Sequence, residues 1–283
     1  MPFECEKTKI VAKTDNIYSF NKNKKDNKVA IFAMYSDSGE INNNIISYLF
    51  ELKKYNDYII LVADNLVLIN ELIKIRGIVD YFLFVRHEEY DFGSYKRGFD
   101  FLKNNNYLKY ISNIVFCNDS VTYTGASLKP FFDRAFKYDF YGLTYHEYGY
   151  IKKLFRKTYK WGRTPHIQSY LFSISANIFK EKKFQRFMKS IKKEKDKKTI
   201  IYKYEIGLSK LLIKLGYSLN TYYPQVYDNV KVLGYFLDKD SSYDGERLFY
   251  KNHKYKFDEE DLRKTLAAVE RVISLTAYKL KVA

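Results

Sequence analysis

The sequence predicts an α/β protein with a central, mainly parallel sheet in a single Rossmann-type domain. The first observation is a set of four apolar runs of strand length, at residues 29–35, 58–64, 79–87 and 110–120. The second is that segments with helical spacing of apolar residues follow the first three runs, at residues 45–55, 70–75 and 93–105. Runs that are apolar throughout are typical of strands buried on both faces, and helices commonly connect the strands of parallel sheets. No internal repeat and no linker rich in Pro and Gly separates these segments, so one domain is the simplest interpretation.

Helices predominate in the second half of the chain. The segments expected there are a helix and short strand within 132–146, a strand running into a helix over 166–179, and helices over 184–193, 204–217 and 258–280. The last helix begins with acidic and ends with basic residues, as the helix dipole favours. We therefore expect a polar N-terminal extension over 1–27, a domain over 28–230, and a basic helical C-terminal region over 231–283. That region would pack on the domain or on a membrane surface, and packing on the protein's own core is the commoner use of such an apolar stripe.

The composition is basic, with 49 Lys and Arg against 33 Asp and Glu and a formal net charge of +16. Such an excess favours anionic partners, which include nucleic acids, anionic membrane surfaces and phosphorylated small molecules. The two cysteines, Cys5 and Cys117, lie too far apart for a zinc-binding CxxC pair and are too few for a disulfide framework. No segment approaches 18 consecutive apolar residues, and the first ten residues lack the apolar core of a signal peptide. We expect a cytoplasmic protein, with peripheral contact to the inner face of the membrane as an open alternative.

Polar residues follow each of the four predicted strands, where ligands bind in open α/β sheets. Tyr35 and Asp37 follow the first, Asp64 the second, the segment RHEEYDFGSYKRG the third, and Asn118-Asp119-Ser120 the fourth. No GxGxxG follows the first strand and no GxxxxGK[ST] is present, which argues against a dinucleotide site or a P-loop.

The triplet Asn118-Asp119-Ser120 has two interpretations. Hard divalent cations take oxygen ligands and are often held through one or two carboxylates together with substrate phosphates. Asp119 suits that role, with Asn118 and Ser120 supplying further oxygens or a hydrogen bond. Asn, Asp and Ser also favour turns after strands, and the triplet taken alone is more typical of a turn.

Three further segments contain candidate binding residues. Gly93 and Ser94 could begin a helix whose free N–H groups face an anion, and a phosphate there would compensate Lys96 and Arg97 in the first turn. Solvated surface positions explain those two cations equally well. His166 and Gln168 precede an apolar segment, and Glu205 opens a late helix; for these three, local sequence favours structural roles.

Five segments together resemble the rhamnan synthesis protein F family of bacterial polysaccharide glycosyltransferases. They are YDFGSYKRGF, CNDSVTYTG, DFYGLTYH, PHIQSYLFSIS and YKYEIGLSKLLIKLGY, in the family's order, within a resemblance that covers residues 28–225. The resemblance implies a GT-A-like fold and transfer of a sugar, rhamnose or another hexose, from a nucleotide-diphosphate donor to a surface polysaccharide such as a capsule or O-antigen. It implies a glycan or lipid-linked glycan as acceptor and no nucleic-acid partner.

The resemblance also implies roles for individual residues. Asp119 occupies the place of the Asp-x-Asp signature of GT-A enzymes. Only one of the two carboxylates of that signature is present, so it stays open whether the enzyme requires Mg²⁺ or Mn²⁺. Glu205 is the first candidate for the base of an inverting transfer and Asp91 the second, while His166 and Gln168 would line the acceptor side. The expected donor-side residues are Tyr35, Asp37, Asp64, Gly93, Ser94, Lys96, Arg97, Asn118 and Ser120.

Two other classes of function stay open. A nucleic-acid-binding protein fits the charge and the segment 151–163, in which six basic residues alternate with aromatic ones. No recognisable nucleic-acid-binding motif supports that reading. The reduced Asn-Asp-Ser triplet also fits an inactive GT-A-like scaffold in a glycan-assembly complex.

Overall fold

The computed structural model describes residues 10–13, 20–152, 159–223 and 247–251. The main sheet contains β1 (Ile10–Lys13), β2 (Asn27–Met34), β3 (Tyr58–Ala63), β4 (Tyr81–Phe84), β5 (Ile111–Asn118), β7 (Phe140–Gly142), β10 (Leu171–Ser175) and β11 (Asn220–Thr221). Two smaller sheets pair β6 (Val121–Tyr123) with β12 (Phe249–Lys251), and β8 (Tyr145–Lys152) with β9 (Tyr159–Ile167). The helices are α1 (Asn43–Lys53), α2 (Ile69–Lys74), α3 (Tyr90–Asn104), α4 (Lys129–Ala135), α5 (Ala176–Phe179), α6 (Lys182–Ser190), α7 (Lys197–Ile200) and α8 (Ile206–Lys214), with a 3₁₀ turn η1 (Leu108–Tyr110) and a π-helical segment η2 (Ile201–Glu205).

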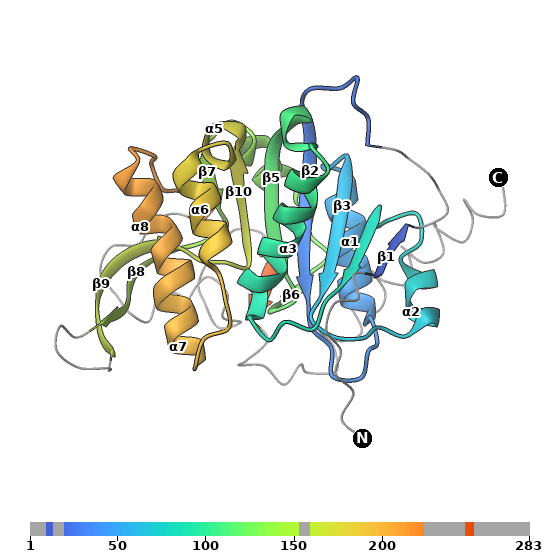
Figure 1. Cartoon of the computed structure of the whole chain (residues 1–283), viewed down its shortest axis with the longest axis horizontal. Helices are drawn as coiled ribbons and strands as arrows, with labels where there is room; N and C mark the ends of the chain where they lie inside the picture. The colour runs from blue at the N-terminus through green and yellow to red at the C-terminus, as the bar shows by residue number, and fades with distance from the viewer. Residues whose placement is uncertain (1–9, 14–19, 153–158, 224–246, 252–283) are drawn as a thin grey trace.

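The strand order of the main sheet is β1-β4-β3-β2-β5-β10-β7-β11. Strands β4, β3, β2 and β5 are parallel, whereas β10 runs antiparallel to both β5 and β7. The α/β class and the parallel centre of the sheet predicted from the sequence are therefore confirmed. All four parallel strands end at the same edge, and the residues that follow them meet there (Figure 1).

Helices cover both faces of the sheet, which explains why the strands are apolar throughout. Side chains of β2 alternate between two hydrophobic clusters: Phe32 lies in the cluster that contains residues of α1 and α4, and Ile31 in the cluster with α3, α6 and α8. Figure 1 shows α3, α6 and α8 on the side of the sheet that faces the viewer. Helix α3 packs very closely, because a Cβ at Gly98 would lie 2.5 Å from Cγ2 of Ile31. Glycine at that position therefore sets the distance between α3 and the sheet.

Both ends of the described chain contain a strand that the sequence did not predict. Residues 1–27 were expected as an extension, but β1 pairs with β4 at the sheet edge. Phe20 is buried, and its ring stacks on Tyr58 and Tyr107 with centroids 4.4 Å away in each case. Within the region 231–283, Leu248 and Phe249 are buried and β12 pairs with β6. The apolar residues inside these otherwise polar segments account for both differences.

The β8–β9 hairpin was not predicted. Its strands flank and partly include the basic segment 151–163, of which 153–158 lie outside the described residues. The helix predicted over 258–280 also lies outside the described residues. In the described part of the chain, no helix combines the length and the apolar character needed to cross a membrane.

Candidate functional site

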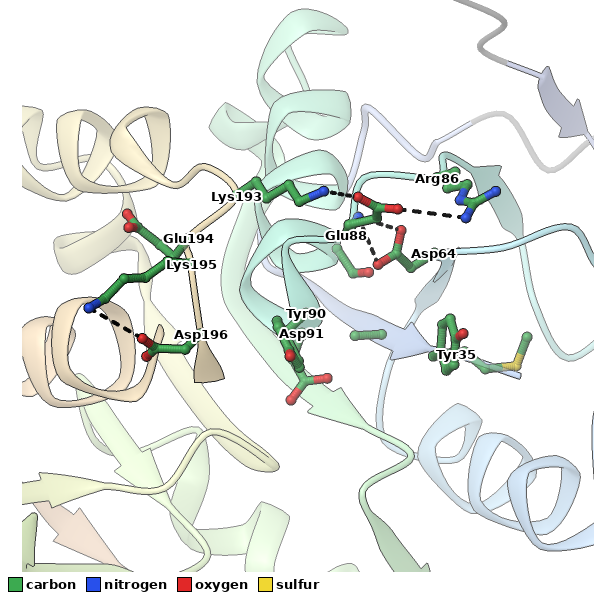
Figure 2. A pocket seen from close by; sticks show the side chains of 13 residues that line it. Tyr35, Asp64, Arg86, Glu88, Tyr90, Asp91, Lys193, Glu194, Lys195 and Asp196 are labelled. Atoms are coloured by element: carbon green, nitrogen blue, oxygen red, sulfur yellow. Dashed lines mark hydrogen bonds and ion pairs between the residues drawn. The ribbon is translucent and has the colours of Figure 1, made fainter. Parts of the chain in front are cut away.

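A pocket of about 560 Å³ opens at the edge where the parallel strands end. Figure 2 shows the side chains around it, which come from the ends of β2 and β3, the β4–α3 connection, the start of α3 and the α6–α7 connection. The lining residues are Ala33, Met34, Tyr35, Asp64, Arg86, Glu88, Tyr90, Asp91, Ser94, Lys193, Glu194, Lys195 and Asp196. Of the predicted site residues, Tyr35, Asp64, Asp91 and Ser94 thus share one cavity.

Asp119 lies next to the end of β2. Its Oδ2 accepts a hydrogen bond from the backbone N–H of Tyr35 at 2.8 Å, which joins the ends of β5 and β2. Burial raises the pKa of Asp119 to about 6, although the Tyr35 N–H opposes the shift. The Tyr35 side chain is 57% exposed, and its hydroxyl donates to Oδ1 of the exposed Asp37 at 2.5 Å. The strand ends thus present one carboxylate and one exposed aromatic ring side by side.

Asp91 is the most perturbed carboxylate at this edge. Burial, together with the negative charges of Asp119 and Glu205, raises its pKa to about 7. Its Oδ2 accepts a hydrogen bond from Nδ2 of Asn118 at 2.8 Å. The other amide atom of Asn118, Oδ1, accepts from the N–H and the hydroxyl of Ser120 at 3.1 and 2.6 Å. Asn118 and Ser120 therefore hold the Asp91 carboxylate in place.

A buried histidine shapes the connection between β4 and α3. The Glu89 N–H donates to Nδ1 of His87 at 3.0 Å, so Nε2 carries the proton and donates to Oγ of Ser94 at 2.9 Å. Burial, with the positive charges of Arg97 and Lys96, lowers the pKa of His87 to about 3, which keeps the ring neutral. A Cβ at Gly93 would lie 2.5 Å from Nδ1, so only glycine leaves room for this ring.

Asp64 fixes the same connection from the end of β3. Its carboxylate accepts the backbone N–H groups of His87 and Glu88. Burial outweighs these hydrogen bonds and raises the pKa of Asp64. Glu88 and Tyr90 have φ of 54° and 56°, a backbone conformation that is costly for residues with side chains. Asp64 and His87 together hold this strained segment at the mouth of the pocket.

Lys96 and Arg97 were expected in the first turn of a helix, where they could face a phosphate, but both hydrogen-bond to other residues of the protein. Helix α3 begins at Tyr90, three residues before the predicted start, which places both cations in its second turn. Nζ of Lys96 donates to the carbonyl oxygen of Ile191 at 2.6 Å. Nη1 of Arg97 donates to Oε2 of Glu89 at 2.6 Å. Gly93 and Ser94 are likewise inside the helix, where they pack against His87 instead of opening it.

Glu205 belongs to a separate buried network. Its Oε2 accepts the N–H and hydroxyl of Ser169 at 3.0 and 2.6 Å, and its Oε1 lies 3.5 Å from Nε2 of His166. Burial alone would raise the pKa of Glu205, but His166 and Ser169 lower it overall. Nδ1 of His166 lies 2.6 Å from the Thr164 carbonyl oxygen. Neither His166 nor the buried Gln168 lines the pocket.

The described residues contain no group of three or more His, Cys, Asp or Glu side chains arranged to hold a metal ion. Asp119 is the predicted metal ligand, and Asn118, expected to supply a further oxygen, directs its amide to Asp91 and Ser120 instead. A cation at this edge would therefore depend on Asp119 and on ligands that the substrate supplies.

Arg86 was expected at the end of the third strand without a role in the site, and the other two cations of the pocket, Lys193 and Lys195, were not predicted from the sequence. The last two belong to the charged run KKEKDKK at residues 192–198, a composition that is typical of a solvated surface. The position of this run gives a weak indication of a role at the site, because the run connects an amphipathic helix to the segment that contains the candidate Glu205.

The protein-family comparison identifies relatives. The family model described as rhamnan synthesis protein F matches residues 59–254, which is more than half of the chain and includes all five segments that suggested the resemblance. Among solved structures, core-mannan synthase A from Aspergillus fumigatus, in a form with Mn and GDP, aligns at 9% identity over 65% of this chain and 69% of that chain, with a TM-score of 0.35. A similarity of that size establishes neither fold nor function. No curated protein matches the chain. The family resemblance seen in the sequence is confirmed: the chain belongs to the rhamnan synthesis protein F family.

Proposed function

We propose that the protein is a GT-A-like glycosyltransferase of polysaccharide synthesis that takes its sugar from a nucleotide-diphosphate donor. Family membership supports the reaction class. The observation that carries the proposal is the pocket at the sheet edge, which combines an exposed aromatic ring, Tyr35, with two cations, Arg86 and Lys193, and a carboxylate whose pKa is about 7, Asp91. This transfer uses three kinds of group: an aromatic ring on which the nucleobase of the donor can stack, cations that bind the diphosphate, and a general base whose pKa lies near neutral pH.

Asp91 is the general base of this proposal. Its carboxylate takes the proton of an acceptor hydroxyl while the hydroxyl oxygen attacks the anomeric carbon of the donor sugar. The bond from that carbon to the β-phosphate oxygen breaks, and the nucleoside diphosphate leaves with the electron pair. Attack from the face opposite the leaving group inverts the anomeric configuration. A base works best when its pKa lies near the operating pH, as the raised pKa of Asp91 does.

Glu205, the first candidate from the sequence, is better suited to a positioning role. Its carboxylate already accepts two hydrogen bonds from Ser169 and faces His166, and its pKa is lowered. A base with a depressed pKa draws a proton weakly at neutral pH. The negative charge of Glu205 contributes instead to the raised pKa of Asp91.

Asp119 is the residue that would hold Mg²⁺ or Mn²⁺ against the donor diphosphate. When bound, the cation would offset charge that develops on the leaving diphosphate. The oxygen chemistry of a buried carboxylate fits such a cation, with donor phosphates supplying further ligands. The acceptor of this proposal is a growing bacterial glycan or lipid-linked glycan, presented at the inner face of the membrane.

Binding of nucleotides tests the proposal directly. We would measure thermal shifts of the protein with a panel of nucleoside diphosphates and nucleotide sugars, with Mn²⁺ and with a chelator, and then donor hydrolysis with each ligand that binds. We expect one base to be preferred and the matching nucleotide sugar to be hydrolysed slowly without acceptor. Tight, salt-sensitive binding of nucleic acid together with no nucleotide binding would refute the proposal and favour the nucleic-acid alternative.

A further inference from the structure

Glu88 bridges two cations that belong to different parts of the chain. Its Oε1 lies 3.6 Å from Nη2 of Arg86, and its Oε2 accepts a hydrogen bond from Nζ of Lys193. Arg86 and Glu88 belong to the β4–α3 connection, Lys193 to the α6–α7 connection, and all three line the pocket. Figure 2 shows the Glu88 carboxylate between the two cationic groups.

The α6–α7 connection is fixed so that Lys193 is directed to the pocket. Before Lys193, Nζ of Lys96 donates to the Ile191 carbonyl oxygen at 2.6 Å. After it, Oε1 of Glu194 accepts from Nζ of Lys203 at 2.7 Å and from the hydroxyl of Tyr204 at 2.9 Å. The neighbours of Lys193 are thus held by α3 and by η2, whereas the Lys193 side chain reaches across to Glu88.

The contacts of Glu88 are of the kind that a stronger anion can replace. The side chains of Lys193 and Glu88 are 65% and 48% exposed, and exposed ion pairs contribute little to stability. A diphosphate carries more negative charge than one carboxylate and presents several oxygens to Lys and Arg, which makes its charge-assisted hydrogen bonds stronger. An anion of that kind would gain both cations at a small cost in protein contacts.

We infer that Arg86 and Lys193 form the diphosphate-binding site of the pocket, and that Glu88 is an internal competitor which the donor diphosphate displaces. The inference rests on the proposed function, because it assigns the phosphate contacts of the same donor. The sequence predicted an anion-binding role for Lys96 and Arg97, and we assign this role to Arg86 and Lys193 instead.

The test compares the affinity of nucleoside diphosphates and of inorganic pyrophosphate for the wild-type protein and three variants, by calorimetry with a chelator and again with Mn²⁺. Glu88→Gln keeps the shape of the side chain and removes its charge, so we expect binding about two- to fivefold tighter. Arg86→Ala and Lys193→Ala each remove a charge-assisted contact, and we expect binding about tenfold or more weaker. In the Lys193→Ala background, Glu88→Gln should tighten binding less than it does alone.

Lys129 and Asp133 on α4 provide the matched control. They form an ion pair with side-chain exposures of 65% and 54%, close to those of Lys193 and Glu88, and neither residue lines the pocket. Lys129→Ala and Asp133→Asn should leave diphosphate affinity unchanged.

Different results would contradict different parts of the reasoning. Unchanged affinity in Glu88→Gln, Arg86→Ala and Lys193→Ala, with nucleotide binding intact in the wild type, would overturn this inference and leave the proposed function standing. Binding of pyrophosphate that responds to the three variants, without binding of any nucleoside diphosphate, would support the anion site and overturn the nucleotide donor. No binding of any diphosphate by the wild type would overturn both.

Discussion

Replacing Asp91 with Asn separates the proposed base from its structural role. Asn has nearly the shape of Asp and keeps an oxygen that can accept the hydrogen bond from Nδ2 of Asn118, which is 2.8 Å long in the wild type. The substitution removes only the ionisable carboxyl. Its effects on rate and on stability should therefore have opposite signs.

The effect on rate follows from the pKa of about 7. General-base catalysis typically contributes about 10²- to 10⁴-fold, so we expect turnover of Asp91→Asn to fall by about that factor. The base acts in its deprotonated form, so the wild-type rate should fall about tenfold for each pH unit below the pKa. The residual rate of the variant should lack this dependence.

The effect on stability follows from the same shift. The pKa of Asp91 is raised from 3.8 to about 7, a difference of about three units that corresponds to about 4 kcal/mol as an upper bound. The folded state favours the protonated carboxyl of Asp91. The stabilising contribution of this protonated group is fully present below pH 3.8 and is lost as the pH rises through about 7. At pH 8 the variant should be more stable than the wild type by up to about 4 kcal/mol, and the gap should close as the pH falls toward about 4.

Two measurements decide the matter: turnover at saturating donor and acceptor across the pH range, and urea unfolding at acidic, neutral and alkaline pH. Asp133→Asn on the exposed face of α4 is the control and should change neither quantity. Near-normal turnover in Asp91→Asn would remove Asp91 as the base. If Asp91→Asn is no more stable than the wild type at alkaline pH, burial and the neighbouring negative charges do not destabilise the ionised Asp91 carboxylate.

Three other substitutions test the surroundings of the base. Glu205→Gln keeps the shape of the side chain but removes the negative charge that faces His166, so it should lower the free energy of unfolding by about 3 kcal/mol near neutral pH and by less as the pH falls through the lowered pKa of Glu205. Turnover should fall far less than in Asp91→Asn, and stability curves and kinetics check both effects. Tyr35→Ala removes an exposed ring and should weaken nucleoside diphosphate binding about tenfold without changing the melting temperature, as calorimetry and thermal unfolding would show. Gly93→Ala places a Cβ 2.5 Å from Nδ1 of His87, so urea unfolding should report a loss of about 1–3 kcal/mol, and a wild-type curve would contradict the close packing described here.

The centre of the fold could be predicted because its strands leave little ambiguity. Every residue from Val29 to Met34 is buried, since side chains on both faces of β2 meet helices, and such a run has few alternatives to an interior strand. Once parallel strands are assigned, the residues that follow them must meet at one edge. Tyr35, Asp64 and Asp119 were placed near one another on that argument alone, and the structure brings them there.

Other features depend on contacts that local sequence does not show. Lys193 and Glu88 are 105 residues apart, and the charged run around Lys193 has the composition of an ordinary solvated surface. The helix was expected to begin at Gly93 and Ser94 with its free N–H groups facing an anion, but Gly93 lies inside the helix and makes room for the ring of His87. The choice between Glu205 and Asp91 depended on their neighbours in space, which raise one pKa and lower the other.

The single carboxylate of the Asn118-Asp119-Ser120 triplet has a consequence for the proposed base as well as for a metal ion. A carboxylate at position 118 would place one more negative charge beside Asp91, whose pKa is already raised by Asp119 and Glu205. Its pKa would then rise further, and at neutral pH the carboxyl would be protonated and unable to accept a proton. Asn118 donates to Asp91 through Nδ2 instead, which favours the ionised form. With Asn rather than Asp at position 118, this protein has one candidate metal ligand fewer, and the proposed base is ionised in a useful fraction of molecules near pH 7.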